Sequence, residues 1–366
     1  MIKMKKSKRI LYFDVIRIMS IIGILFCHAS ALYIVSDIGT PNFYITAFYD
    51  CFRDFSVPLF VMLSGALLIG KNDSLIAFFK RRLSRIFIPF LFWALMTIIN
   101  SFIYLKHSID IDNAINIFLG HGGTLGGLYW FIWMIIAVYF GIFIINGILD
   151  FGNKNIEGFN KRFPGLLALL SVVYIILFQF RLLSPIFYNS ILIYYFSFVC
   201  YAAIGYFTAN FHFLESKINT NILTAITTIL SLLLYSNYIF NYVVPTSLFE
   251  NHFTYLGYFN IHILLITLCM FLMYKFLSNT SFFKRLAHGK YEDLIILLSK
   301  YSYGIYLCHY LVLFHLRIFF MIYMNLNNQN SIIWIPILVM LTLILSAMIL
   351  NVLNRIPLLN KVTGID

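Results

Sequence analysis

The chain has 366 residues, of which 61% are hydrophobic and only 11% charged, and its mean hydropathy is +0.88. A water-soluble domain of this size needs more charged side chains to cover its surface, so a soluble globular protein is excluded. The net charge is +12, and a strongly positive net charge is common among nucleic-acid-binding proteins. Here, however, the basic residues lie in short segments between apolar runs, and we expect no nucleic-acid partner.

Apolar runs long enough to cross a bilayer follow one another from one end of the chain to the other. A spanning helix needs about 20 mostly apolar residues, and we find ten segments of this kind. We therefore predict an all-α, polytopic integral membrane protein with a single membrane-embedded domain over residues 1–366 and no soluble domain. The predicted helices cover residues 10–34, 48–70, 86–105, 127–149, 164–180, 188–209, 221–240, 257–277, 297–323 and 332–354.

The basic residues lie mostly on one side of this predicted layout. Twenty of the 26 Lys and Arg residues fall in the two terminal segments and in every second connecting segment. Only Arg53, Lys106 and Arg181 fall on the opposite side, and the other three lie within spans. Because Lys and Arg accumulate in cytoplasmic loops, we predict that both termini are cytoplasmic. The protein is expected to be a multi-pass component of the inner or plasma membrane of the cell.

The first predicted helix contains three ionisable residues on one stripe, which are Asp14, Arg17 and His28. Such groups are costly in lipid, so this stripe should face the interior of the helix bundle or an aqueous pocket. Arg17 and His28 are separated by about 16 Å of helical rise, which places Arg17 near the cytoplasm and His28 toward the outer leaflet. An imidazole inside a membrane is a natural proton shuttle or base. A purely structural alternative is an Asp14–Arg17 pair that fixes the helix end.

The second connecting segment contains a dense basic group, formed by Lys80, Arg81, Arg82 and Arg85. The plain interpretation is that these residues anchor the cytoplasmic end of the next span. Three of the four are arginines, and the guanidinium fork suits phosphate better than an ammonium does. This loop is therefore also a candidate phosphate-binding site.

The ninth predicted helix has a second polar stripe, because Ser302, Tyr306, His309 and Arg317 fall within about 80° of one face. This helix leaves the cytoplasm at its start, so His309 should lie near the middle of the membrane. Taken alone, a hydrogen-bonded core histidine packed among tyrosines is the simpler interpretation.

The five cysteines predict neither a disulfide framework nor a metal site. None forms a CxxC pair, and none lies with histidines at metal-ligand spacing. Each lies in or beside an apolar run, where a small apolar packing residue is expected.

Five segments together resemble the acyltransferase-3 family of bacterial membrane O-acyltransferases. Each is weakly specific alone, but they occur in order over nearly the whole chain. Many family members carry an additional secreted esterase-like domain, which has no counterpart in this sequence. The resembling segments are Phe13-Asp14 with Arg17 and His28, Phe60 to Ser64-Gly65, Lys80-Arg81-Arg82 with Arg85 and Pro89, Leu128 to Trp130 with Tyr139, and Ser302-Tyr303-Gly304 with Tyr306 and His309.

This resemblance implies transfer of an acyl group, commonly acetyl, from cytoplasmic acyl-coenzyme A to a hydroxyl of a surface glycan or lipid-linked sugar. His28 is then the expected base or acyl relay, with Arg17 and Asp14 on the path to it and His309 as the second candidate base. The basic segment 80–85 would bind the donor phosphates, and no metal is expected.

Three alternatives remain open. The donor could be succinyl-coenzyme A rather than acetyl-coenzyme A. The protein could also be a non-enzymatic polysaccharide exporter or flippase, or a structural subunit of a synthase complex. The chain contains no internal repeat, which disfavours a transporter because many transporters are built from repeats.

Overall fold

A computed structural model describes residues 9–31, 40–71, 74–105, 111–120, 127–243, 257–324 and 330–365. Within these ranges the regular structure is helical throughout and includes no strand, so the all-α prediction is confirmed. The α-helices are α1 (Leu11–Ser30), α2 (Pro41–Asp50), α3 (Phe52–Leu68), α4 (Leu75–Leu105), α5 (Ile111–Leu119), α7 (Trp130–Asn155), α8 (Phe159–Gln179), α9 (Ile186–Asn189), α10 (Ile191–Ser197), α11 (Val199–Asn210), α12 (Thr220–Tyr238), α14 (Ile261–Asn279), α15 (Ser281–Leu286), α16 (Lys290–Met324) and α17 (Ser331–Arg355).

Each of the ten predicted spans coincides with a helix or a pair of consecutive helices. In the described part of the chain, nine helical segments are long and apolar enough to cross a membrane. The eighth predicted span is the exception in length, because its apolar helix covers only Ile261–Leu277. A polytopic membrane protein is therefore confirmed, and the described residues contain nine candidate spans and one shorter apolar helix. The cytoplasmic location of the termini stays a prediction.

One predicted boundary is clearly wrong, because the third span was expected to begin at residue 86 and α4 begins at Leu75. The added residues are mostly Leu, Ala, Phe, Lys and Arg, which are compatible with a helix. Ser74 also caps this end, since its hydroxyl accepts a hydrogen bond from the Ala77 amide at 3.4 Å. The charged residues make this segment too polar to be recognised as part of a membrane span, but they do not prevent it from forming a helix.

The centre of the bundle is built on close contact between α3 and α11. A Cβ atom added to Gly65 would lie 1.9 Å from the carbonyl oxygen of Ala202, and one added to Gly205 would lie 2.1 Å from that of Met62. Glycine at both positions therefore lets the two backbones touch. Helices in membranes commonly associate in this way, because close packing replaces the hydrophobic driving force that acts in water.

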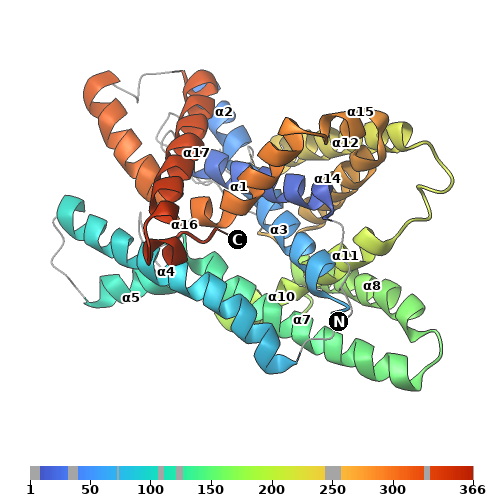
Figure 1. Cartoon of the computed structure of the whole chain (residues 1–366). Helices are drawn as coiled ribbons and strands as arrows, with labels where there is room; N and C mark the ends of the chain where they lie inside the picture. The colour runs from blue at the N-terminus through green and yellow to red at the C-terminus, as the bar shows by residue number, and fades with distance from the viewer. Residues whose placement is uncertain are drawn as a thin grey trace.

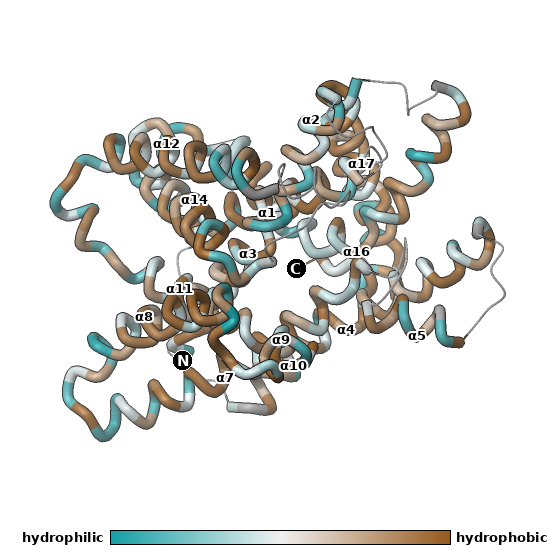
Figure 2. Tube along the Cα trace, turned by 180° about the vertical axis from the view of Figure 1, so that it is seen from behind, coloured by the Kyte–Doolittle hydropathy of each residue, from teal (hydrophilic) through white to brown (hydrophobic). Residues whose placement is uncertain are grey.

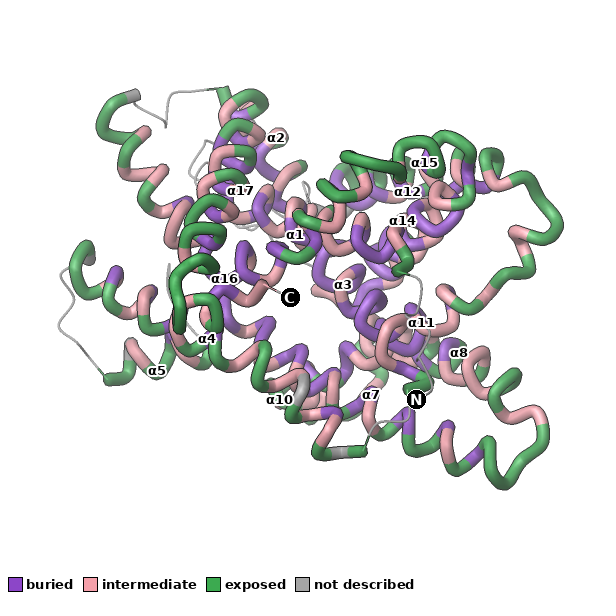
Figure 3. Tube along the Cα trace, in the orientation of Figure 1, coloured by how far each residue is buried: buried purple, intermediate pink, exposed green. Residues whose placement is uncertain are grey.

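Helix α1 lies inside this assembly, where it packs against α3 on one side and α16 on the other (Figure 1). Buried residues concentrate along α1, α3 and α11, whereas outer helices such as α4 and α8 have many exposed residues (Figure 3). Those exposed residues are largely apolar, as the hydropathy colouring of the helices shows (Figure 2). An apolar exterior around a polar-containing interior is the arrangement that a bilayer requires.

Candidate active site

The polar stripe of α1 faces α16 along its length. Arg17 near the start of α1 donates a hydrogen bond to Ser299 of α16, and the ring of His28 near the end of α1 lies beside the ring of His309. Both pairs run in the same order along the two helices, so α1 and α16 are parallel neighbours. The two stripes that the sequence predicts on different helices thus form one interface with a polar cluster at each end.

The first cluster surrounds the carboxylate of Asp14, which is only 3% exposed. Arg9 donates two hydrogen bonds to it, from Nε to Oδ2 and from Nη2 to Oδ1, each at 2.7 Å. The hydroxyl of Ser299 donates to Oδ1 at 2.6 Å, and Nη1 of Arg17 lies 3.4 Å from the same oxygen. Nη1 of Arg17 also donates to the Ser299 hydroxyl at 2.8 Å. The Asp14–Arg17 pair is therefore present, within a network that also includes Arg9.

The second cluster contains the two histidines. The ring centroids of His28 and His309 are 5.2 Å apart, with an angle of 39° between the ring planes. Tyr310 packs edge-on against His28, with centroids 5.7 Å apart. His28 is half-buried, and within the described residues it makes no hydrogen bond. The sequence treats His28 and His309 as rival bases at different depths, whereas the structure places them in one site.

The imidazole of His309 is fully buried and held in one orientation. Its Nδ1 lies 2.6 Å from the carbonyl oxygen of Tyr306 and 3.2 Å from that of Ile305. Two carbonyl acceptors require Nδ1 to carry the proton and to donate it. Nε2 is then the acceptor atom, and it is buried with no hydrogen-bond partner in the described part of the chain. A buried polar atom without a partner is uncommon in a folded protein and often indicates a functional site.

A row of aromatic side chains on one face of α16 leads to this histidine. The rings of Tyr303 and Tyr306 are stacked with centroids 6.5 Å apart, and the Tyr306 and His309 rings are 5.9 Å apart. The Tyr303 hydroxyl donates to the carbonyl oxygen of Ile86 in α4 at 2.8 Å, and the Tyr306 hydroxyl donates to that of Leu128. The row therefore connects the first turns of α4 with the histidine pair.

The basic group lies on these first turns of α4, and not in a loop as the sequence predicts. Lys80 and Arg85 are exposed. Arg82 donates to the carbonyl oxygen of Phe78 at 3.1 Å, and its guanidinium lies 3.9 Å above the Phe78 ring. Nothing is described for the Arg81 side chain. The structure thus places the basic group at one end of the tyrosine row, apart from the histidines at the other end.

A group of charged residues on α3 is not among the candidate site residues that the sequence suggests. Arg53, which the charge count places on the non-cytoplasmic side, lies within the predicted span 48–70 and in α3, and it interacts electrostatically with His28. Its Nε lies 3.6 Å from Oδ1 of Asp54, and both Asp54 and Asp50 are buried. The available signal was the spacing, because three ionisable residues within five positions directly precede an apolar run.

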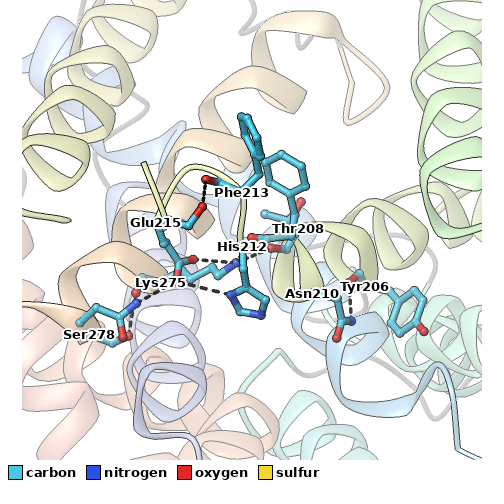
Figure 4. Close-up of polar contacts among 11 residues, drawn as sticks. Tyr206, Thr208, Asn210, His212, Phe213, Glu215, Lys275 and Ser278 are labelled. Carbon is cyan, nitrogen blue, oxygen red and sulfur yellow. Dashed lines mark hydrogen bonds and ion pairs between the residues drawn. The ribbon is translucent and has the colours of Figure 1, made fainter. Parts of the chain in front are cut away.

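Lys275 is a second buried basic residue, and it lies within the predicted span 257–277. It lies in α14, is 2% exposed, and donates to the carbonyl oxygens of Thr208 at 3.0 Å and of Phe211 at the end of α11. Its Nζ also lies 2.9 Å from Oε1 of Glu215 (Figure 4). These contacts satisfy the last carbonyls of α11, which makes Lys275 a structural helix cap.

Within the described ranges, no three His, Cys, Asp or Glu side chains come together as a metal-binding group. The same ranges include all five cysteines, and each is a free thiol.

A sequence profile of the acyltransferase-3 family, described as an acyltransferase domain, matches residues 10–351. The match covers nearly the whole chain, so the protein belongs to this family of membrane acyltransferases. No curated protein and no solved structure matches the chain significantly. The family prediction made from the sequence is thus confirmed.

Proposed function

We propose that this membrane acyltransferase transfers an acetyl group from cytoplasmic acetyl-coenzyme A to a hydroxyl of a cell-surface or lipid-linked sugar. One observation carries the proposal, namely the contact between His28 and the buried His309, whose Nε2 has no hydrogen-bond partner among the described residues. Two imidazoles in contact inside a membrane domain are suited to moving the proton that ester formation releases.

The donor approaches from the cytoplasm and is bound by the basic start of α4. Lys80, Arg81, Arg82 and Arg85 hold the phosphates of coenzyme A, which favour the planar, two-pronged donors of arginine. For this contact Arg82 exchanges its present partner, the Phe78 carbonyl, for a phosphate. The thioester arm then extends beside Tyr303 and Tyr306 toward the histidine pair.

His28 serves as the base for the transfer step. It accepts the proton of the acceptor hydroxyl while the hydroxyl oxygen forms a bond to the acyl carbon and the carbon–sulfur bond breaks. The proton then passes from His28 to the departing thiolate, so the products are an ester and free coenzyme A, and the imidazole is regenerated. In a second version of this step, His28 attacks the thioester itself and relays the acyl group, which burst kinetics would distinguish.

The remaining candidates have supporting roles. His309 is the second candidate base and, through its contact with His28, a positioning residue for that ring. Arg17 cannot act as a base because it stays protonated, so it attracts the donor or balances Asp14. Asp14 holds both Arg9 and Arg17 at the start of α1.

The decisive experiment supplies purified protein in lipid nanodiscs with labelled acetyl- or succinyl-coenzyme A and a sugar acceptor. We expect release of coenzyme A and appearance of the label on the sugar. Mass spectrometry of surface glycans from a deletion strain should show a matching loss of one acyl mass increment. A protein that moves sugar across the bilayer but releases no coenzyme A from either donor would contradict the proposal and support an exporter.

A further inference from the structure

A short segment after α17 folds back into the bundle. The chain leaves α17 at Arg355 and forms a single turn, η3 (Leu359–Val362), which lies against α4 (Figure 1). Thr363, directly after this turn, is fully buried, and the side chain of Ile365 packs against the core. Residues 359–365 therefore occupy space inside the bundle, and we call this segment the strap.

The strap covers the end of the tyrosine row that lies next to the basic group of α4. A Cβ atom added to Gly364 would lie 2.8 Å from the ring of Tyr303. One added to Gly304 would collide with the carbonyl oxygen of Thr363. The Tyr303 hydroxyl donates to the carbonyl oxygen of Ile86, which directly follows the basic group. The strap therefore packs on the first tyrosine that a ligand arm extending from the basic group would meet.

Packing, rather than polar contacts, holds the strap in the bundle. Nε1 of Trp93 in α4 donates to the Val362 carbonyl oxygen at 3.1 Å, and in the described part of the chain this is the one hydrogen bond that joins the strap to another helix. The Thr363 hydroxyl bonds within the strap, because it donates to the Asn360 carbonyl oxygen at 2.8 Å and accepts from the Ile365 amide at 3.3 Å. Few polar contacts therefore have to break when the strap moves as a unit.

The residue before the strap has a strained backbone. Leu358 has φ +74° and ψ −40°, a conformation that residues other than glycine rarely adopt. Its side chain is exposed, so its own packing does not offset the strain. The buried strap must hold Leu358 in this conformation, and the strain is relieved when the strap leaves the bundle. A segment with one polar attachment and a strained entry is suited to two positions, one inside the bundle and one outside it.

We propose that residues 359–365 are a displaceable strap that closes the donor entrance, and that acyl-coenzyme A replaces it on Tyr303. This inference rests on the proposed acyl transfer and adds a regulatory element to the same site. The closed strap shields the tyrosine row from cytoplasmic water, and the thioester arm of the donor takes the place of the strap when it binds. The apparent affinity for the donor is then reduced by the fraction of molecules in which the strap is closed.

Two substitutions in the full-length protein in nanodiscs should shift the KM for acetyl-coenzyme A in opposite directions. Trp93→Phe removes the hydrogen bond that attaches the strap, and it should lower this KM about three- to tenfold, the range of one net hydrogen bond. Leu358→Gly removes the strain of the closed form, and it should raise the same KM about threefold or more. A strap that only stabilises the fold predicts that neither variant shifts the KM in this way.

Each substitution has a matched control. Trp133→Phe removes the same kind of bond, because Nε1 of Trp133 donates to the Phe118 carbonyl oxygen at 3.0 Å. Arg181→Gly relieves the same kind of strain, because Arg181 has φ +53°. Both controls lie outside the strap and should keep the donor KM of the wild type. If Trp93→Phe folds poorly, Gly304→Ala replaces it, since the added methyl group favours the helix but collides with the strap.

Hydrogen exchange measures the displacement without any turnover. Wild type and variants in nanodiscs are exchanged with and without excess coenzyme A, and mass spectrometry follows the amides of residues 359–365. Isothermal titration calorimetry on the same samples measures coenzyme A binding. We expect slow exchange of the wild-type strap without ligand and faster exchange with coenzyme A bound. Trp93→Phe should exchange fast without ligand, and Leu358→Gly should exchange more slowly than the wild type.

The outcomes separate this inference from the proposed function. Unchanged or slower exchange of the strap with coenzyme A bound would overturn the strap while leaving acyl transfer intact. The same conclusion follows if the donor KM does not shift in opposite directions in the folded variants. Failure of the wild type to bind coenzyme A and to release it from any acyl donor would overturn the proposed function, and the strap with it.

Discussion

The two ends of the α1–α16 interface differ in how their polar atoms are satisfied. At the Asp14 end, the carboxylate accepts hydrogen bonds from two arginines and a serine and is almost completely buried. At the His28 end, two imidazoles are in contact and Nε2 of His309 has no partner within the described ranges. A complete network stabilises a helix contact, whereas an incomplete one has capacity left for a substrate. The same pair of helices therefore combines an end whose polar atoms are satisfied with the end at which we propose that the reaction takes place.

The strongest test of this difference is removal of His28. General-base catalysis typically contributes about 10²–10⁴-fold, so His28→Ala should lose most of its turnover while remaining inserted and folded. Acyl transfer by the purified variant measures the effect, and a monodisperse peak in detergent establishes folding. His315→Ala is the control, because His315 lies on α16 but is exposed and bonded to its own helix. Near-normal turnover of His28→Ala would show that His28 is not the base for acyl transfer.

A smaller loss is expected for His309→Ala. Its Nδ1 is fixed by two backbone carbonyls, and its ring contacts that of His28, so we expect its main effect on the reaction to be holding the His28 ring in place. The variant should be slower than the wild type but faster than His28→Ala, and less stable because a buried ring is lost. Turnover and thermal unfolding measured on the same samples separate the two effects. An inactive His309→Ala beside an active His28→Ala would reverse the roles of the histidines.

The basic start of α4 should affect donor binding rather than the chemical step. Replacing Arg81 and Arg82 together with Gln should raise the KM for acyl-coenzyme A by about tenfold or more, and added salt should weaken wild-type binding. Lysine at both positions should recover the affinity for acyl-coenzyme A only in part if the arginine contacts are bidentate. Lys154→Gln is a suitable control, since Lys154 is an exposed residue paired with Asp150. Unchanged donor affinity would show that these arginines only anchor the cytoplasmic end of the helix and do not bind the donor.

The smallest effect on turnover is expected at the Asp14 end. Asp14→Asn leaves Arg9 and Arg17 without their carboxylate and should lower the free energy of unfolding by about 1–3 kcal/mol, a range reduced because both arginines are partly exposed. Turnover per folded molecule should fall far less than in His28→Ala. A loss of turnover as large as that of His28→Ala, with unchanged stability, would show that both ends take part in the reaction.

Periodicity and charge predict much of this architecture. The helix positions follow from apolar length, and the inward stripe of α1 follows from the cost of exposing Asp14, Arg17 and His28 to lipid. The partner of that stripe does not follow, because Arg17 and Ser299 are 282 residues apart in the sequence. Periodicity identifies which face of a helix is polar, but the register between two helices depends on packing across the whole bundle.

The misassigned residues share one physical cause. Hydropathy assigns the residues of α4 before residue 86 to a loop because several of them are charged, and they are helical. Hydropathy measures the transfer of a side chain into lipid, whereas helix formation depends on backbone geometry. A charged segment such as Lys80 to Arg85 can therefore lie inside a helix whose start hydropathy alone places too late.

The backbone contact between α3 and α11 has a consequence for evolution. Gly65 lies roughly 18 Å along α3 from Arg53, and neither Gly65 nor Gly205 leaves space for a methyl group. A single extra carbon there would push the two helices apart and shift the far end of α3 as well. Variation at Gly65 and Gly205 would thus change how α3 packs against α1, which carries His28. The tolerance of this membrane domain to sequence change is therefore limited by packing glycines such as these as well as by the residues of the candidate site.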